Sequence, residues 1–371
     1  MFKSSLINIM FMTCVVVLTA GPGEQCRADG KLPITDFVLS DGAVNLEGIR
    51  ATGYEGGLDL SSGRVFLDPT TGEPVVTTAG RDIGDNDYWA DGFHSRQLGG
   101  PGDVYCMAVY NGDLIVGGYF QTAGDTIARN IAAWDGTNWS RLAGGISGTY
   151  RDVYALEVYD GWLYVGGDFQ SAGGPARNFA AWDGTEWHQF GNFMNDRVYD
   201  LHVWNDLLVV GGAFTKTPDN TDVNLIATWD GVSWGTLGTG ITGSNDSKVM
   251  CLDTYDGDLV AAGFFSQADG SSAGNLAAWN GSGWSELGGG AWGFVYDMVV
   301  WDSKLVVDGG GGKPLAAWDG ASWTTLIDYI DAGDVRGLEV HDGQLLAYGH
   351  FDDIEGVPMS GLIQWLSLIH I

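Results

Sequence analysis

The sequence predicts an all-β fold made of six similar units, and three observations support this prediction. A pattern written as NGDLIVGGYF…NIAAWDGTNW at residues 111–139, and as DGWLYVGGDF…NFAAWDGTEW at residues 160–187, recurs at spacings of 40 to 51 residues. The chain holds 59 Gly and 16 Trp but only 9 Pro, which fits short strands joined by tight turns. No segment carries the apolar stripe of an amphipathic helix. A repeat of this length built from short strands is typical of a β-propeller.

Each unit divides into four expected strands, called a to d in chain order. Strand a, VYALEVY at 153–159, is followed by an Asn-Gly or Asp-Gly pair in most units, which suits a two-residue hairpin turn. Strand b ends in a glycine pair in units 1 to 3 and in a single glycine, at the second position of that pair, in units 4 to 6, and strands c and d each carry a Trp. Because these Trp recur strictly inside strands, we expect them in the core between units rather than on a sugar-binding surface. We expect the second glycine of each pair to let neighbouring units approach closely: Gly118, Gly167, Gly212, Gly263, Gly309 and Gly349.

The two ends of the repeat region complement each other. The last unit reaches strand c at GLIQW and shows no strand d, whereas residues 88–100, YWADGFHSRQLGG, hold the remnants of a strand d and its exit. An N-terminal strand that completes the last blade would close the ring and remove its open edges. The sequence therefore predicts a six-bladed β-propeller of four-stranded blades over 88–365, closed as three strands plus one.

The glycine pair that ends strand b and the Trp of strand d resemble kelch-type propellers. The fuller pattern, LYVGGDF…NFAAWDG…W, is similar to secreted bacterial propeller repeats and to those of fungal cortical polarity-marker proteins. The resemblance covers roughly residues 88–365. It implies the fold and assigns no single function, because propellers host unrelated activities.

The N-terminus is typical of an export signal. Lys3 precedes an apolar run of about 15 residues that ends at Ala20, shorter than the roughly 20 residues of a membrane span. We therefore expect residues 1–20 to be a signal peptide, the mature chain to be secreted or held at the cell surface, and no integral membrane segment. Residues 21–87 form either a leader or a small β cap. We interpret residues 366–371, LSLIHI, as a non-native tail, which implies that the natural chain continues further.

Charge and motifs exclude several classes of function. The chain carries 47 acidic and 17 basic residues, a formal net charge of −30, so its surface repels phosphate backbones and nucleic acid is not expected as a partner. It contains no nucleophile elbow, Walker loop or EF-hand loop, and its 6 His show no metal-ligand spacing. We therefore assign no catalytic residue and expect no organic cofactor. Cys106 and Cys251 are predicted to be buried thiols, too far apart for a disulfide.

Strand a offers one candidate metal site. The innermost strands of a propeller line its channel, and a ring of oxygen ligands there would suit Ca²⁺. The candidate ligands are Glu157, Asp200, Asp253, Asp297 and Glu339. The alternative is a hydrated acidic channel, so we expect at most weak binding of Ca²⁺.

The variable loops give a candidate ligand surface. In a four-stranded blade the b–c and d–a loops emerge on one face, and the nearly invariant a–b and c–d turns emerge on the other. Unit 5 has a short b–c loop, and the d–a loops beside it present Trp292, Asp328, Tyr329 and Asp331. Aromatic rings beside carboxylates suit a sugar or a peptide. The alternative is that Trp292 packs into the channel mouth or the adjacent gap.

We expect an exported, monomeric binding or interaction module for a glycan or protein ligand. One alternative is a polysaccharide-acting enzyme whose catalytic residues lie on the variable b–c and d–a loops. Two carboxylates about 5 to 10 Å apart in a cleft would favour it. Another alternative is a structural repeat segment of a larger surface protein, truncated here.

Overall fold

The computed structural model has an all-β architecture. It describes residues 32–33, 50, 56–59, 64–67, 74–77, 93–94 and, between 102 and 365, all residues except 292, 310–314, 331–332, 342–343, 352, 355–356 and 359–361. Within this part of the chain, no helix has the length and apolar character needed to cross a membrane. The expected signal peptide and the expected non-native tail lie outside the described residues.

Four consecutive antiparallel sheets of four strands each have the predicted order a–b–c–d. Repeat 2 consists of β13 (Asp152–Tyr159), β14 (Trp162–Asp168), β17 (Phe179–Trp182) and β18 (Trp187–His188). Repeat 3 consists of β19 (Val198–Trp204), β20 (Leu207–Gly212), β21 (Ile226–Trp229) and β22 (Trp234–Gly235). Repeat 4 consists of β24 (Lys248–Tyr255), β25 (Asp258–Phe264), β28 (Leu276–Trp279) and β29 (Trp284–Glu286). Repeat 5 consists of β30 (Met298–Trp301), β31 (Lys304–Asp308), β32 (Leu315–Trp318) and β33 (Trp323–Ile327).

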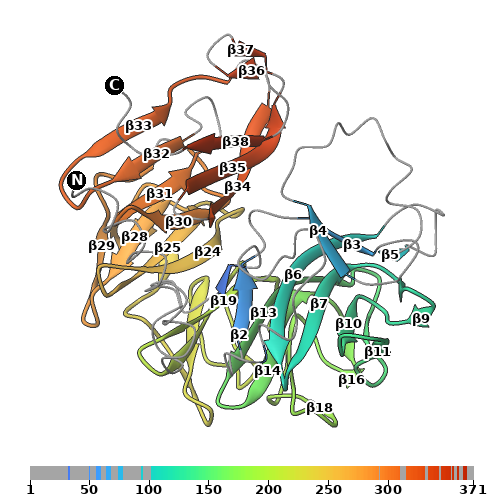
Figure 1. Ribbon diagram of the computed structural model, residues 1–371. Helices are drawn as coiled ribbons and strands as arrows, with labels where there is room; N and C mark the ends of the chain where they lie inside the picture. Colours follow the sequence, from blue (N-terminus) through green and yellow to red (C-terminus); the bar gives the residue numbers. More distant parts are fainter. Residues whose placement is uncertain are drawn as a thin grey trace, which may run out of the picture.

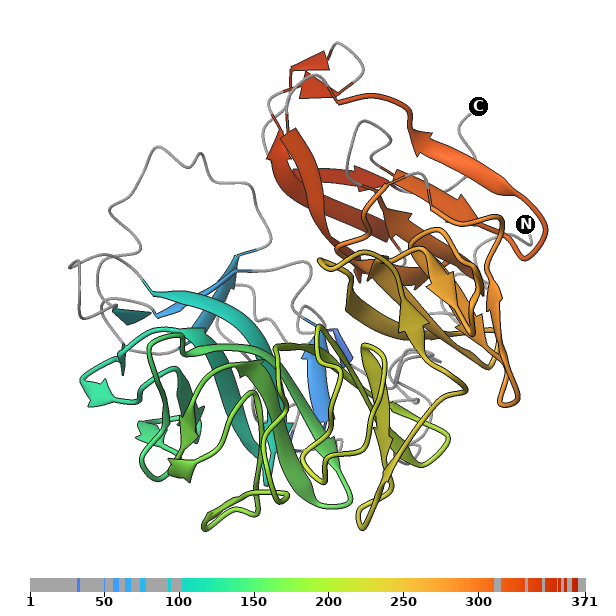
Figure 2. The same cartoon turned by 180° about the vertical axis from the view of Figure 1, so that it is seen from behind.

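The first and last repeats differ in strand number. Repeat 1 consists of β6 (Asp103–Tyr110), β7 (Asp113–Tyr119), β10 (Ile131–Trp134) and β11 (Trp139–Arg141), within a sheet that two further strands extend to six. Repeat 6 has β34 (Gly333–His341), β35 (Gln344–Phe351) and β38 (Leu362–Trp365). Figures 1 and 2 show the sheets following one another along an arc, and strands a of successive repeats are neighbours. Small sheets in such a row are of the kind that forms propeller blades.

The N-terminal segment pairs with repeat 1. Strand β5 (Phe93–His94) pairs with β8 (Thr122–Ala123) in the b–c connection of repeat 1, whereas the expected closing strand would pair with β38. No described strand pairs with the outer edge of β38. Instead, β2 (Gly56–Asp59) pairs with the inner edge of β6, and β1 (Leu32–Pro33) pairs with β2. The leader also contains a hairpin, formed by β3 (Arg64–Leu67) and β4 (Pro74–Thr77).

Arg50 of the leader makes a hydrogen bond to repeat 1 that later repeats receive from the repeat before them. Its Nε donates to the Gly112 carbonyl at 2.7 Å, and its guanidinium also donates to the Asp135 carbonyl at 2.6 Å. In the next three repeats the equivalent a–b turn carbonyl accepts a hydrogen bond from an aromatic residue of the preceding repeat. These pairs are Tyr110 with Gly161 at 3.2 Å, Tyr159 with Asp206 at 2.8 Å and Trp204 with Gly257 at 3.1 Å. The leader thus supplies repeat 1 with a contact that the preceding repeat supplies elsewhere.

The glycine pair of strand b permits close packing, but the two glycines have different roles. A Cβ added to Gly166, the first glycine, would lie 2.5 Å from Cγ1 of Val198 in the next repeat, and Gly117 and Gly211 face Val153 and Val249 in the same way. A Cβ added to the second glycine would instead overlap the strand a backbone of its own repeat. The expectation that the second glycine faces the neighbouring repeat is therefore wrong; the first glycine does so.

Tryptophans form the core between repeats, as predicted. The strand c residues Trp134, Trp182, Trp229 and Trp279 are buried. Strand d tryptophans donate through Nε1 to carbonyls of the connection that enters their repeat: Trp187 to Ala143 at 3.0 Å, Trp284 to Leu237 at 2.9 Å and Trp323 to Gly288 at 2.8 Å. Each of these three rings therefore both packs and satisfies its polar atom, whereas the buried Nε1 of Trp234 in repeat 3 has no hydrogen-bond partner. Cys106 and Cys251 are buried thiols that form no disulfide, which confirms that prediction.

We predict that Gly166→Ala lowers the free energy of unfolding by about 1–3 kcal/mol, because the new methyl group would overlap Val198. Guanidinium denaturation of the purified protein measures the change. Gly283→Ala is the matched control, since its nearest neighbour would lie 4.0 Å away. Equal stability of the two variants would contradict the role given to Gly166.

Candidate functional site

Short loop sheets define the two faces of the repeat array. The strand on the connection into repeat 2, β12 (Ile146–Ser147), pairs with β15 (Ser171–Ala172) in the b–c connection of the same repeat. In repeat 4, β23 (Ile241–Thr242) pairs with β26 (Gln267–Ala268) in the same way. The d–a and b–c connections therefore share one side of the repeats, which we call the loop face. The opposite side, formed by the a–b and c–d turns, is the turn face.

Exposed apolar side chains gather on the loop face. Among the described residues, seven of the large hydrophobic residues that are exposed lie in its loops or at the adjoining start of a strand a: Tyr105, Ile127, Tyr150, Phe193, Phe294, Tyr296 and Tyr329. The eighth, Val232, lies in a c–d turn. Exposed apolar groups concentrated on one side of a protein mark an interaction surface more often than scattered ones do.

A row of tyrosines crosses repeats 1 to 3 on this face. Tyr105, Tyr154 and Tyr199 are each the second residue of the repeat unit, and each lies at a β-bulge in the pairing of strands a and b. The bulge leaves this residue out of the regular ladder and redirects its side chain. The ring centroids of Tyr105 and Tyr154 are 5.7 Å apart, and those of Tyr154 and Tyr199 are 5.5 Å apart. We call these three residues the tyrosine ladder.

Charged side chains of both signs surround the tyrosine ladder. The Tyr154 hydroxyl donates to Asp152 at 3.1 Å, and the Lys248 ammonium lies 5.9 Å from the centre of the Tyr199 ring. Burial, and then the charge of Asp152, raises the pKa of Tyr154 well above its ordinary value. The pKa of Tyr105 is raised by burial and then by Asp103. The hydroxyls therefore remain protonated and can donate hydrogen bonds at neutral pH.

Arginines connect the ladder to neighbouring strand ends. Arg197 Nε donates to the Asp168 carboxylate at 2.6 Å, and the Arg151 guanidinium lies 5.4 Å from the centre of the Tyr119 ring. Each of these contacts joins strand b of one repeat to the entry of the next. An ion pair and a cation–π contact thus join the repeats that carry the ladder.

The structure places two of the four predicted ligand-binding residues. Tyr329, which is 50% exposed, and Asp328, also exposed, lie on the loop face between β33 and β34, as expected. Trp292 and Asp331 lie outside the described residues, as does most of the short b–c loop of repeat 5, residues 310–314. Sequence reasoning missed the tyrosine ladder, although Tyr recurs at the second position of the unit in repeats 1, 2, 3 and 5.

Three of the five proposed channel acids are buried. Glu157, Asp253 and Glu339 have relative exposures of 5%, 3% and 0%, so they do not line a hydrated channel as expected. Strand β2 lies beside β6 and β13 on the inner side of the sheets, where the open channel was expected. Their role as Ca²⁺ ligands stays a prediction.

The other two channel acids stabilise contacts between repeats. Asp200 accepts hydrogen bonds from the Leu201 amide and from the Leu252 amide of the next repeat, both at 2.8 Å. Asp297 accepts in the same way from Met298 and from Leu338 of the next repeat, both at 2.9 Å. Both oxygens of each carboxylate therefore hold backbone amides. Among the described residues, the only group of three side chains with metal-ligand spacing lies elsewhere, in a c–d turn of repeat 2.

Comparison with known proteins gives only distant similarity. No protein-family model matches the chain, and no curated protein matches it. The extracellular domain of a putative hybrid two-component system from B. thetaiotaomicron has a TM-score of 0.49 and 10% identity, over 84% of this chain and 40% of that chain. The computationally designed Ika8 protein has a TM-score of 0.41 and 16% identity, over 69% of this chain and 72% of its own. The chain spans less than half of the first structure, and the fold assignment rests on the sheets described above.

We predict that alkaline pH destabilises the fold partly through Tyr154. A tyrosine whose pKa is raised in the folded state contributes stability that is complete below its unfolded pKa of about 10 and is lost as pH rises toward the folded pKa. The free energy of unfolding should therefore fall as pH rises above about 10, and Tyr154→Phe should make this decline shallower. Urea denaturation at several pH values measures it. Tyr150→Phe, at an exposed ring, is the control, and an unchanged slope in Tyr154→Phe would contradict the prediction.

Proposed function

We propose that the chain is an exported, kelch-like β-propeller that binds a neutral glycan on its loop face. In this proposal the six repeats are six blades of one ring, and the N-terminal segment lies between the first and last of them. The contacts of β1 with both β2 and β34 support that place for the segment. The apolar run before Ala20 supports export.

The tyrosine ladder carries the glycan-binding proposal. Aromatic rings offer apolar surface to the C–H face of a sugar ring, and nearby polar groups bind its hydroxyls. Tyr105 is 43% exposed at the end of the ladder, and Asp103 and Asp152 lie close enough to affect its pKa. This combination of ring, hydroxyl and carboxylate suits a polyhydroxylated ligand.

Charge favours a neutral ligand. A net charge of −30 repels polyanions, and Arg197, two residues before Tyr199 of the ladder, is already paired with Asp168. A neutral oligosaccharide requires no charged partner on the protein. Its hydroxyls can donate hydrogen bonds to the carboxylates of Asp103 and Asp152 beside the ladder. A protein ligand is the alternative outcome of the test below.

We predict that Tyr105→Ala weakens binding of a neutral oligosaccharide about tenfold, because the exposed ring of the ladder is lost. A glycan array with the mature chain identifies the oligosaccharide, and calorimetric titration measures its affinity. Val232→Ala removes an 85% exposed apolar side chain from the turn face and should leave affinity unchanged. Melting temperatures of both variants should stay close to that of the wild type.

Three outcomes would count against this assignment. Absence of any glycan ligand, together with capture of a peptide, would replace the glycan by a protein ligand. Equal affinity of Tyr105→Ala and the wild type would exclude the ladder. A loss in Tyr329→Ala alone would move the site to the loop between repeats 5 and 6.

A further inference from the structure

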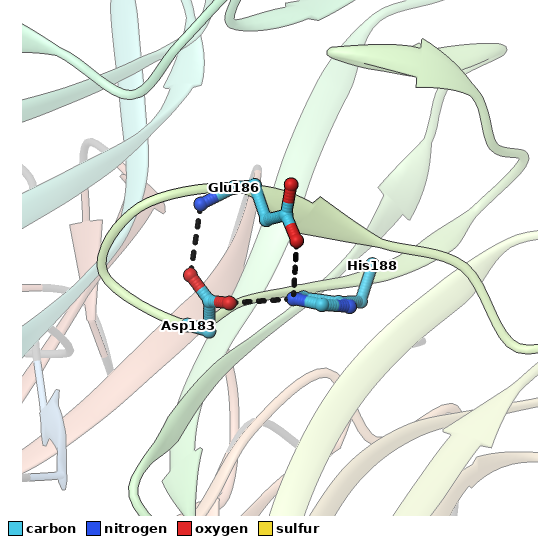
Figure 3. Close-up of side chains that lie close together, drawn as sticks. All are labelled: Asp183, Glu186 and His188. Carbon is cyan, nitrogen blue, oxygen red and sulfur yellow. Dashed lines mark hydrogen bonds and ion pairs between the residues drawn. The ribbon is translucent and has the colours of Figure 1, made fainter.

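The c–d turn of repeat 2 brings together three side chains of the types that bind transition metals. One ligand atom from each of Asp183, Glu186 and His188 lies within 4.8 Å of the others. His188 Nε2 is 2.6 Å from Asp183 Oδ2 and 4.0 Å from Glu186 Oε1. Figure 3 shows the Asp183 and Glu186 carboxylates both directed at the His188 ring. This group lies on the turn face, away from the tyrosine ladder.

The hairpin fixes the orientation of two of these side chains. Asp183 Oδ1 accepts hydrogen bonds from the amides of Thr185 at 2.7 Å and Glu186 at 2.8 Å, which leaves Oδ2 directed at His188. The His188 ring packs against Trp162, with ring centroids 4.3 Å apart. The Glu186 amide, and after it His188 and Thr185, hold the pKa of Asp183 well below its usual range.

The other repeats show that the turn does not require Glu186 or His188. In each of the next three repeats and in repeat 1, the residue equivalent to Asp183 accepts the same two amide hydrogen bonds: Asp135, Asp230, Asn280 and Asp319. The position of Glu186 holds Asn, Ser, Gly and Ser in those turns, and the position of His188 holds Ser, Gly, Ser and Thr. The geometry of the turn thus explains why Asp183 is present, but it does not explain the presence of Glu186 and His188.

The donor set selects the class of metal. Imidazole and carboxylate suit Zn²⁺ and its first-row neighbours, whereas Ca²⁺ takes six to eight oxygen ligands. In a tetrahedral zinc site the ligand atoms lie about 3.4 Å apart, between the two separations measured at His188. The Glu186 side chain is 75% exposed, so it can move to shorten the 4.0 Å separation between its Oε1 and His188 Nε2.

We propose that Asp183, Glu186 and His188 bind a divalent ion of the Zn²⁺ type, one ion per chain. Asp183 Oδ2, Glu186 Oε1 and His188 Nε2 are the three protein ligands, and the remaining position is open to solvent or to a further ligand. The ion replaces the hydrogen bond between Asp183 and His188. Because the group lies on the turn face, this site is independent of glycan binding.

Calorimetric titration of the untagged mature chain with ZnCl₂ tests the proposal. The wild type should bind one Zn²⁺ saturably and Ca²⁺ much more weakly. Glu186→Gln keeps the shape of an exposed side chain and should weaken Zn²⁺ binding at least about tenfold. Zn²⁺ should raise the melting temperature of the wild type but not of this variant, since an ion that binds only the folded state stabilises it.

Asp230→Asn is the matched control, because it changes the equivalent carboxylate in a turn that has Ser and Gly at the other two positions. It should bind Zn²⁺ as the wild type does, and Asp183→Asn should not. Without metal, Glu186→Gln should melt at the wild-type temperature. No saturable Zn²⁺ binding, equal binding by Glu186→Gln, or Ca²⁺ binding as tight as Zn²⁺ binding would overturn the proposal.

Discussion

From repeat 1 to repeat 4, the packing of each repeat on the next depends on a valine that fills the space left by a glycine. Val198 lies where the side chain of Gly166 would be, and the same relation holds for two other pairs of adjacent repeats. Without a Cβ at the glycine, strand a of one repeat can approach strand b of the previous repeat closely. This approach brings turn carbonyls within reach of the aromatic hydroxyls and indole N–H groups of neighbouring repeats. The hydrogen bonds to the a–b turn carbonyls of repeats 2 to 4 therefore follow from one steric condition, the absence of a Cβ at the first glycine.

The tyrosine ladder follows from the same packing. The second glycine of the pair lies against the strand a backbone at the β-bulge, and the bulged residue in repeats 1 to 3 is Tyr. Because successive strands a are held at a constant separation, the rings of Tyr105, Tyr154 and Tyr199 are spaced almost equally. Repeats 4, 5 and 6 have Ala262, Asp308 and Tyr348 at the position of the first glycine. In repeat 5, Asp308 is fully buried and accepts hydrogen bonds from the amides of Tyr296 and Asp297.

Strand order, turns and the tryptophan core could be predicted from sequence because they depend on local patterns that recur. Features that depend on register could not. The different roles of the two glycines, the exposure of the bulged tyrosines and the pairing of β2 with β6 all depend on which residues face each other across strands. The buried Asn178 is a further example. Its side chain accepts from the Phe169 amide at 3.1 Å and donates to the Met194 carbonyl at 3.3 Å, so it joins the end of strand b to the loop that enters the next repeat.

On the turn face, each hairpin depends on one side chain of its c–d turn, and the residues beside that side chain can vary. On the turn face, backbone amides of the turn hold the pKa values of Asp135, Asp230 and Asp319 below their usual range, so much of the negative charge there is part of the turn itself. Each such carboxylate uses one oxygen for the turn amides, so the other is available for a neighbouring side chain. In repeat 3 that neighbour is Ser233, at 2.9 Å, and in repeat 2 it is His188. Residues beside the turn can therefore change from repeat to repeat without loss of the hairpin, and a binding site can arise in one repeat while the others keep only the turn.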